Sequence, residues 1–393
     1  MRVFIIIFTD PAWHPACVFP MQMFAEAGCS VHVLYRAPVH HSPTQGVYTG
    51  KLGSNIQLHP VGSGHSGGSS MLDFQLFVVR AMRLSRRLKP SIIIGYDLHG
   101  FATAFIAHTI HPSAKLVYHS LDVTSIKGAN LQIKLLKRLE FMGARRAQHV
   151  IFPATGRADF FKSEAHLQHD PAIVKNCQRL NLSDYKRGML NELTQGKLSG
   201  FDRIVLHLGS LGTSLAIQEI VQSVPIWRGN WALILMGTGS ESYLSHIRSL
   251  VSSLNLEDQV FILPTATYDL WYDTLHSAHL GLALYKAGDI NYDYMAGSGN
   301  KMGLYLKAGI PSLVPNIPDF AAFIERYRTG EVVESINPQS IAQAINKIFS
   351  DAEQYKQYCQ NAKDAFASEF NFEHQYEPVL RQLLSPTLDN NPS

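Results

Sequence analysis

Lys301 lies in the stretch GSGNKMGLYLKAGIP (residues 297–311), where a small polar turn leads into a short apolar helix pattern that ends at Gly309. A lysine in the first helical turn is electrostatically unfavourable, because the backbone amides there already carry partial positive charge. An anion bound between the ammonium and the amides removes this conflict. We expect Ser298 or Asn300 to cap the helix, and the amides of residues 298–300 with Lys301 would suit a diphosphate.

Two glycine-rich turns follow apolar strand patterns in the second half of the chain. IVLHL leads into Gly209-Ser210-Leu211-Gly212, and LILM leads into Gly237-Thr238-Gly239-Ser240. Glycines in such turns allow the backbone to approach a phosphate or a ribose closely. Neither turn fits a Walker loop or the full G-x-G-x-x-G pattern, so an ordinary strand-to-helix turn stays open as the alternative for each.

In the first half, the side chains suited to acid–base chemistry also follow strand patterns. They are Asp122 and His119 in KLVYHSLD, His99 in GYDLHG, and His14, next to Trp13, in TDPAWHP. A histidine near an acceptor hydroxyl acts as general base or orients the hydroxyl, since its pKa lies near neutrality. The chain has 18 histidines, so a purely structural role stays open for each of them.

Continuous apolar runs alternate with helix-like stretches in both halves. The runs are RVFIIIF, SVHVLYR, PSIIIGYD, AKLVYHSLD and QHVIFPA in the first half, and DRIVLHLGS, WALILMGTG, DQVFILP, HLGLALY and IPSLVP in the second. Such runs are typical of parallel sheets with both faces covered by helices. We therefore predict an α/β protein of two doubly wound domains, whose ligands bind beyond the carboxyl ends of the strands.

The net charge of +3 hides an asymmetry between the halves. Residues 1–180 hold 19 Lys and Arg against 9 Asp and Glu, and residues 181–393 hold 15 against 22. The positive charge gathers in residues 78–89 and 127–146. Such patches attract phosphates and anionic lipid head groups, and no nucleic-acid-binding motif accompanies them. Contact of the N-terminal domain with an anionic membrane is one hypothesis, and solvated helix faces are the other.

Residues 3–8, the longest early apolar run, match one buried strand and fall short of the roughly 18 residues of a spanning helix. They also lack the cleavage pattern of a signal peptide, so we expect a cytoplasmic protein with at most peripheral membrane contact. No D-x-D motif occurs, and the close histidine pairs lack acidic or Cys partners at ligand spacing. We therefore expect no metal site.

The order HLGSLG, LILMGTGSE, VFILP, LHSAHLGLALY and SGNKMGLYLKAGIPSLV resembles the donor-binding domain of the family-4-like glycosyltransferases of the GT-B fold. In that family a stretch Pro/Gly-Asn-Lys-x-x-Glu-Tyr-x-x-x-Gly-x-Pro binds the nucleotide sugar. GYDLHGFATAFIAHTIHPSAKLVYHSLD, DPAIVKNCQRL and FNFEHQYEPVLRQLL resemble further segments of the family, so the resemblance covers nearly the whole chain.

The resemblance implies two Rossmann-like domains that face a cleft. Residues 1–185 would bind the acceptor, residues 200–370 would bind the nucleotide sugar, and the helix at 371–385 would cross back to the first domain. The residues implied for the donor are Gly209, Ser210, Gly237, Gly239, Ser298, Gly299, Asn300, Lys301 and Tyr305. Asp122, with His119 or His99, would be catalytic and would position the acceptor, and Trp13 and His14 would bind it.

The sequence departs from the family pattern at the positions that bind the ribose in that family. Leu304 replaces the glutamate that binds the ribose diol, and Ala296 replaces the other acid of the pair. Asp289, Asp293, Tyr305 or backbone groups would have to substitute. The phosphate-contacting K-G pair is missing after Gly212, and the family's S-H-E appears as Ser-Leu-Asp at residues 120–122, without its histidine.

These patterns predict a glycosyltransferase that moves a sugar from a UDP- or GDP-type nucleotide sugar to a hydroxyl acceptor on a sugar, a lipid-linked molecule or a small molecule. The resemblance implies retention of anomeric configuration, no metal and no further cofactor. Two alternatives stay open. One is a degenerate, non-catalytic binding or scaffold protein, because of Leu304 and Ala296, and the other is a sugar-nucleotide epimerase or hydrolase.

Overall fold

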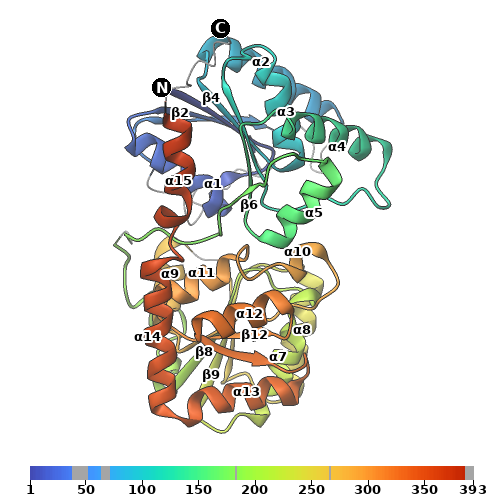
Figure 1. Cartoon of the computed structure of the whole chain (residues 1–393). Helices are drawn as coiled ribbons and strands as arrows, with labels where there is room; N and C mark the ends of the chain where they lie inside the picture. Colours follow the sequence, from blue (N-terminus) through green and yellow to red (C-terminus); the bar gives the residue numbers. More distant parts are fainter. Residues whose placement is uncertain (38–51, 63–70, 182–183, 265–266, 386–393) are drawn as a thin grey trace. The chain divides into compact units, whose positions relative to one another are not determined.

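The computed structural model describes residues 1–37, 52–62, 71–181, 184–264 and 267–385, without the side chain of Trp13. The chain divides into two units, of which the first is Met1–Lys175 with Phe372–Ser393 and the second is Asn176–Asn371. Each unit contains one parallel sheet with helices on both faces (Figure 1). The apolar runs of the sequence therefore form two doubly wound α/β layers, as predicted.

Unit 1 alternates strands and helices and ends on the last helix of the chain. Its strands are β1 (Arg2–Ile7), β2 (Ser30–Ala37), β3 (Ile56–Gly62), β4 (Ile92–Tyr96), β5 (Lys115–His119), β6 (His149–Phe152) and β7 (Ala172–Ile173). Its helices are α1 (Pro15–Glu26), α2 (Met71–Leu88), α3 (Asp97–His108), α4 (Leu131–Ala144), α5 (Thr155–Ala165) and α15 (Phe372–Leu384).

The sheet of unit 1 has the order β3-β2-β1-β4-β5-β6-β7, with all pairs parallel. The chain order reverses between β1 and β4, and the carboxyl ends of two such strands leave a crevice where ligands of open α/β sheets bind. Ile5 of β1 pairs with Val33 of β2 and Ile94 of β4, and all three are fully buried. Apolar side chains on both faces explain why these strands read as continuous apolar runs.

Helices α2, α3 and α4 cover one face of this sheet, and α1 and α15 lie together on the other (Figure 1). Helix α3 is the central one, since it packs against β1, β4 and β5 and also against α2 and α4. Helix α15 is fixed at its carboxyl end by Lys115, whose Nζ donates to the carbonyls of Gln382, Leu383 and Ser385 at 3.2, 2.8 and 2.6 Å. A lysine there satisfies carbonyls that have no partner within the helix.

Unit 2 has strands β8 (Arg203–Leu208), β9 (Trp231–Met236), β10 (Val260–Leu263), β11 (Leu280–Leu282), β12 (Ser312–Pro315) and β13 (Gly330–Val333). Its helices are α6 (Met189–Leu193), α7 (Ile217–Ser223), α8 (Glu241–Ser253), α9 (Tyr268–Ser277), α10 (Ile290–Asp293), α11 (Asn300–Ala308), α12 (Pro318–Tyr327), α13 (Pro338–Ser350) and α14 (Ala352–Ser368). The strand order is β10-β9-β8-β11-β12-β13, so the reversal falls between β8 and β11.

Every strand predicted from an apolar run is present, and the strands that the prediction lacks are β3, β7 and β13. All three lie at the edge of a sheet, where one side of the strand has no neighbour. Strand β3 has no buried residue, β7 is 2 residues long, and β13 opens with a glycine and a glutamate. Edge strands bury less surface, so their sequences carry a weaker apolar signal.

None of the helices in the described ranges is both long enough and apolar enough to cross a membrane.

Candidate functional site

Lys301 lies at the strand reversal of unit 2. Its Nζ is 3.4 Å from the Tyr285 hydroxyl and 5.0 Å from the centre of that ring, and Tyr285 follows β11. A Cβ built on Gly209, directly after β8, would lie 3.5 Å from the same Nζ. The carboxyl ends of β8 and β11 are the two strand ends that flank the crevice of this sheet. The structure therefore puts the ammonium at the position where this fold binds ligands.

The Lys301 side chain is 9% exposed and, within the described residues, has no ion-pair partner. Burial lowers its pKa from 10.5 to about 8, so the group is still mainly charged at pH 7. The same charge contributes, after burial, to lowering the pKa of the neighbouring His207 to about 3. A buried ammonium without a carboxylate is costly, and an anionic ligand would remove that cost.

The first turn of α11 adds further donors beside Lys301. Helix α11 begins at Asn300, and none of the hydrogen bonds found in the described residues uses the amide N–H of Asn300, Lys301 or Met302. Amides at a helix start bind anions through their N–H groups and through the helix dipole. That Lys301 and these amides hold one anion together stays a prediction.

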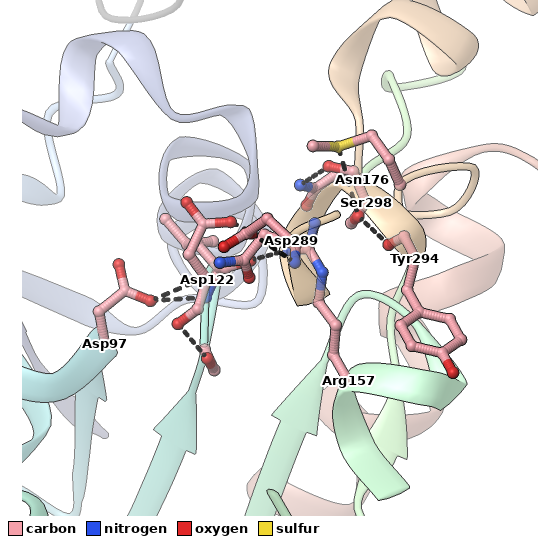
Figure 2. A network of polar contacts seen from close by, with 11 residues as sticks. Asp97, Asp122, Arg157, Asn176, Asp289, Tyr294 and Ser298 are labelled. Atoms are coloured by element: carbon pink, nitrogen blue, oxygen red, sulfur yellow. Dashed lines mark hydrogen bonds and ion pairs between the residues drawn. The ribbon is translucent and has the colours of Figure 1, made fainter. Parts of the chain in front are cut away.

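The capping prediction is wrong in its details. The N-cap residue of α11 is Gly299, and no side chain caps the helix. Ser298 is buried, and its hydroxyl donates instead to the carbonyl of Tyr294 at 2.7 Å, which Figure 2 shows. The Asn300 Oδ1 is buried without a hydrogen-bond partner. A glycine at the N-cap leaves the amides of the first turn open to a ligand, because no side chain occupies them.

Asn176, which was not among the predicted site residues, fixes this turn. Its amide N–H donates to the Gly297 carbonyl at 2.8 Å, and its Nδ2 donates to the Ser298 carbonyl at 2.6 Å (Figure 2). A Cβ on Gly303 would lie 2.9 Å from the Asn176 carbonyl, so α11 packs directly on this backbone. The KNCQRL segment that resembles the family therefore orients the start of α11.

The two glycine-rich turns touch each other at the ends of β8 and β9. A Cβ on Gly237 would lie 1.5 Å from the Gly209 carbonyl oxygen, and one on Gly239 would lie 2.3 Å from the Leu211 carbonyl oxygen. Gly209 itself has φ +102°, a conformation that favours glycine. The close contact between the two turns therefore explains why residues 237 and 239 are glycines, without any role in ligand binding. Gly209 and the exposed Ser210 remain predicted donor contacts.

We expect Gly237→Ala to destabilise unit 2 by about 3 kcal/mol or more, because the new methyl group would force the two turns apart. Urea unfolding at neutral pH measures this. Gly200→Ala is the matched control, since nothing lies within 4 Å of its Cβ position, and it should change the stability by less than about 0.5 kcal/mol. Equal unfolding curves for the two variants would contradict the contact between the turns.

The predicted donor role of Tyr305 is contradicted by its burial. The side chain is fully buried, and its hydroxyl donates to the carbonyls of Leu206 at 3.3 Å and Leu282 at 3.1 Å. Burial raises the pKa of this phenol well above its usual value. Tyr305 therefore links α11 to β8 and β11, and it is not available to a ribose.

Tyr305→Phe should lower the stability by about 1 kcal/mol, because the hydrogen bonds to the two carbonyls are lost. The affinity for UDP should stay within about twofold, since the ring that supports α11 is kept. Urea unfolding and titration calorimetry measure the two quantities. A tenfold weaker UDP affinity with unchanged stability would restore the donor role of the hydroxyl.

Leu304 and Ala296, which replace the family's glutamates, are buried at 1% and 3% exposure. Of the suggested substitutes, Asp289 accepts from the Asn291 amide at 2.8 Å at the start of α10, and Asp293 accepts from the Gly288 amide at 3.0 Å. Asp293 is partly buried and Asp289 is exposed. After Tyr305 is set aside, these two carboxylates and backbone groups remain as candidates for the ribose.

In unit 1, Asp97 follows β4 at the strand reversal and was not among the predicted site residues. It has φ +50°, which is unfavourable for a residue other than glycine, although Asp and Asn tolerate it best. Its Oδ1 accepts from the amides of Leu121 at 2.6 Å and Asp122 at 3.3 Å (Figure 2). Burial raises the pKa of Asp97 to about 7, and the charge of Asp122 adds to this shift. Strain and a shifted pKa at one residue are typical of functional sites.

Asp122 lies beside Asp97 and has an exposed side chain. Its carboxylate is 3.0 Å from Nη1 of Arg157, which is itself buried and also donates to the Leu121 carbonyl at 2.6 Å. The carboxylate is thus held in place and still open to solvent at 70% exposure. His14 is close enough that the charge of Asp122 raises its pKa, although burial lowers it more. Asp97 and Asp122 therefore form one cluster, and His14 lies within range of its charge.

His119 does not belong to this cluster, and its predicted catalytic role is contradicted. The side chain is fully buried and stacks on Tyr96, with ring centres 4.8 Å apart, and on Tyr376 of α15 at 6.3 Å. Burial lowers its pKa to about 3, so the ring is neutral. It packs between the sheet and α15 and is closed to an acceptor.

His99 is partly buried and stacks on Phe8 with ring centres 5.3 Å apart, while Phe74 of α2 meets its edge. Burial and the charge of Arg36 lower its pKa. It therefore lies in an aromatic group beside the ends of β1 and β4. The side chain of Trp13 lies outside the described part of the chain. Within the described residues, no three His, Cys, Asp or Glu side chains gather as a metal site would require.

The chain is similar to a known protein family in sequence and to solved proteins in structure. Residues 194–365 match the family model described as Glycosyl transferases group 1. No curated protein sequence matches the chain. The structure of Anabaena HepE with UDP and glucose is 15% identical, with a TM-score of 0.76 over 98% of this chain and 99% of that chain.

Two further solved structures share the fold along their whole length. Sucrose-phosphate synthase from Thermosynechococcus elongatus is 15% identical, with a TM-score of 0.71 over 97% of this chain and 98% of that one. A Listeria monocytogenes protein described as a UDP-N-acetylglucosamine 2-epimerase is 13% identical, with a TM-score of 0.62 over 96% and 94%. The resemblance predicted from the sequence is confirmed: the chain has the GT-B fold of glycosyltransferases, and its second unit matches their group 1.

Proposed function

We propose that the protein is a glycosyltransferase that moves a sugar from a nucleotide diphosphate sugar to a hydroxyl acceptor. The observation that carries the proposal is the buried Lys301 ammonium, which lacks a carboxylate partner among the described residues and lies at the strand reversal next to Gly209. The group 1 match over the same unit supports it. HepE, a structural neighbour, was solved with UDP and with UDP-glucose, which favours a UDP-type donor.

In this proposal the diphosphate lies against Lys301 and the first amides of α11. As the bond between the anomeric carbon and the diphosphate oxygen breaks, negative charge grows on the leaving group. Fixed donors aimed at that charge stabilise the transition state without reorganisation. Asn176 acts as a positioning residue, because it holds the turn before α11 in place. We propose that this set of donors acts without a metal ion and without a further cofactor.

The acceptor binds on unit 1 beside Asp122 and His14. Asp122 orients the acceptor hydroxyl, and Arg157 holds Asp122 from the buried side. Asp97 is a second positioning residue, since its carboxylate holds the amides of Leu121 and Asp122. The new bond joins the acceptor oxygen to the anomeric carbon, and the acceptor proton leaves with the diphosphate. We propose retention of the anomeric configuration, following the family resemblance.

Thermal unfolding with a panel of UDP-, GDP- and dTDP-sugars tests the donor site, and a positive donor is then incubated with candidate acceptors. We expect one nucleotide class to raise the melting temperature and Lys301→Ala to abolish that rise. NMR of the product tests retention through the coupling constant of the anomeric proton, and activity in excess EDTA tests the metal-free proposal.

Leu304 and Ala296 favour a second candidate, a binding protein without catalysis, because two acids of the family pattern are replaced by buried apolar side chains. Nucleotide-sugar binding without transfer to any acceptor would support this candidate. Conversion of the sugar nucleotide to an epimer without an acceptor would instead support an epimerase, a function described for the Listeria structure. No response to any nucleotide would overturn the donor site itself.

A further inference from the structure

Helix α4 carries a stripe of exposed apolar and cationic side chains. Leu131, Leu135 and Met142 are 73%, 49% and 45% exposed, and Lys134 and Arg138 are exposed between them. Positions 131, 135, 138 and 142 follow one another at spacings of four, three and four residues, so they lie on one side of the helix. Large apolar side chains in such a row are unusual on a surface that faces only water.

Helix α2 repeats this arrangement. Leu72, Leu76 and Val79 are exposed along one side of its first half. The same side continues into the second half with exposed arginines, at positions 80, 83, 86 and 87. We call the exposed residues of α2 and α4 the α2/α4 surface.

The two helices belong to one layer of unit 1, because both pack against α3 (Figure 1). Phe74 of α2 and Ile133 of α4 contact the same buried cluster of Leu98, Ala102 and Leu136. The apolar side chains that hold the layer together thus point inward, and the α2/α4 surface is additional to them. Phe74 also meets the edge of His99, a predicted catalytic residue in the first turn of α3.

The α2/α4 surface is cationic without exposed acids. Both helices are described in full, and their two acids are buried in ion pairs. Asp73 lies 3.8 Å from Arg36, and Glu140 lies 2.6 Å from Lys137. Neither acid therefore neutralises the exposed arginines and lysine.

We propose that the α2/α4 surface docks on an anionic lipid bilayer. The leucines would enter the boundary between head groups and acyl chains, while the arginines and lysine would contact lipid phosphates. A nucleic acid would use the cations and leave the leucines exposed to water. A second copy of this positively charged unit would be repelled, because Met1–Lys175 with Phe372–Ser393 hold 19 Lys and Arg against 12 Asp and Glu. An anionic bilayer can bury the leucines and also bind the arginines and the lysine.

Vesicle co-sedimentation of the full chain tests the docking. We expect binding to vesicles of phosphatidylglycerol and phosphatidylcholine at 0.1 M NaCl. On pure phosphatidylcholine the partition coefficient should fall at least tenfold, and at 0.5 M NaCl at least fivefold, since salt screens the attraction. Absence of binding to the anionic vesicles, or equal binding to both vesicle types at every salt concentration, would overturn the proposal.

Matched double variants locate the docking surface. L76Q/L135Q removes apolar contact and R83Q/R138Q removes charge, and each should weaken binding to anionic vesicles at least tenfold. All four positions are exposed, so circular dichroism and the melting temperature should be unchanged. L193Q/I226Q is the control, because Leu193 and Ile226 of unit 2 have 44% and 40% exposure. Equal loss in the control and test variants would overturn the location.

Sedimentation velocity tests whether a second copy of the protein, instead of a bilayer, covers the α2/α4 surface. A wild-type dimer that L76Q/L135Q dissolves would identify a second copy and overturn membrane docking, and a monomer in both proteins supports it. The inference does not depend on the proposed sugar transfer. Stabilisation by UDP should be unchanged in both surface variants, so a failed donor site and a failed docking surface give different results.

Discussion

We expect Lys301→Met to stabilise the ligand-free protein and to abolish its stabilisation by UDP. The ammonium is buried without an ion-pair partner among the described residues, and burial lowers its pKa to about 8. Replacing it by an apolar side chain of similar length should raise the free energy of unfolding by about 2 kcal/mol at pH 7. Affinity for UDP should fall about 100-fold or more, because a buried charge contact with the diphosphate is lost.

The pH dependence gives this prediction a second readout. The pKa of Lys301 is lower in the folded state than in the unfolded state, so the unfolded chain binds more protons between about pH 8 and pH 10.5. Wild-type stability therefore gains a contribution as the pH rises through this window. The Met variant lacks that contribution, so its advantage should shrink between pH 7 and pH 9.5.

Urea unfolding at the two pH values and calorimetric titration with UDP measure these effects. Lys347→Met is the control, because Lys347 is 68% exposed on α13 and pairs with Glu331 at 2.8 Å. It should change neither quantity by much, since exposed ion pairs contribute about 0–1 kcal/mol. UDP affinity at the wild-type level in Lys301→Met would show that the buried ammonium does not hold the diphosphate.

The second large effect is expected at Asp97. Asp97→Asn keeps an oxygen for the amides of Leu121 and Asp122 and removes the charge. Burial raises the pKa of Asp97 to about 7 in the folded protein. The folded protein therefore binds more protons than the unfolded chain between about pH 4 and pH 7. As a result, the free energy of unfolding of the wild type falls as the pH rises through this window. The variant should therefore be about 2 kcal/mol more stable than wild type at pH 8 and about equal near pH 4.

The transfer activity of Asp97→Asn should fall, although its stability at pH 8 should rise. Without its charge, residue 97 holds the loop of Asp122 less firmly, and we expect kcat/KM to fall about tenfold at pH 8. Wild-type kcat/KM should rise as the pH passes 7, while the variant should lack this rise. Asp159→Asn, an exposed change on α5, is the control for stability and activity. A variant with lower stability at pH 8 would contradict the shifted pKa.

Lys301 and Asp97 share one physical character. Each is an ionisable group at a strand reversal. Burial favours the neutral form of each, so it lowers the pKa of Lys301 and raises the pKa of Asp97. Such groups destabilise the free protein and are retained where a ligand or a reaction uses the charge. Unit 2 thus offers a positive site suited to a diphosphate, and unit 1 offers carboxylates suited to orienting a hydroxyl.

Much of the fold can be predicted from the sequence, because strands buried on both faces must be apolar along their whole length. β1, β4, β8 and β9 are such strands, and each predicted run overlaps the observed element. The strands β3 and β13 were missed because an edge strand has a neighbour on one side and tolerates polar residues. The glycine turns after β8 and β9 were also recognised, although their contact with each other was not.

The sequence by itself determined two doubly wound parallel sheets and the place of Lys301 in the first turn of α11, because hydrophobic period, glycine turns and helix starts are local properties. Only the tertiary structure decided which candidates lie near one another. It buried His119 and Tyr305 and brought Asp97 to the amides of Leu121 and Asp122, 24 and 25 positions along the chain. Burial and pairing depend on neighbours distant in the chain, and spacing along one sequence carries no information about them.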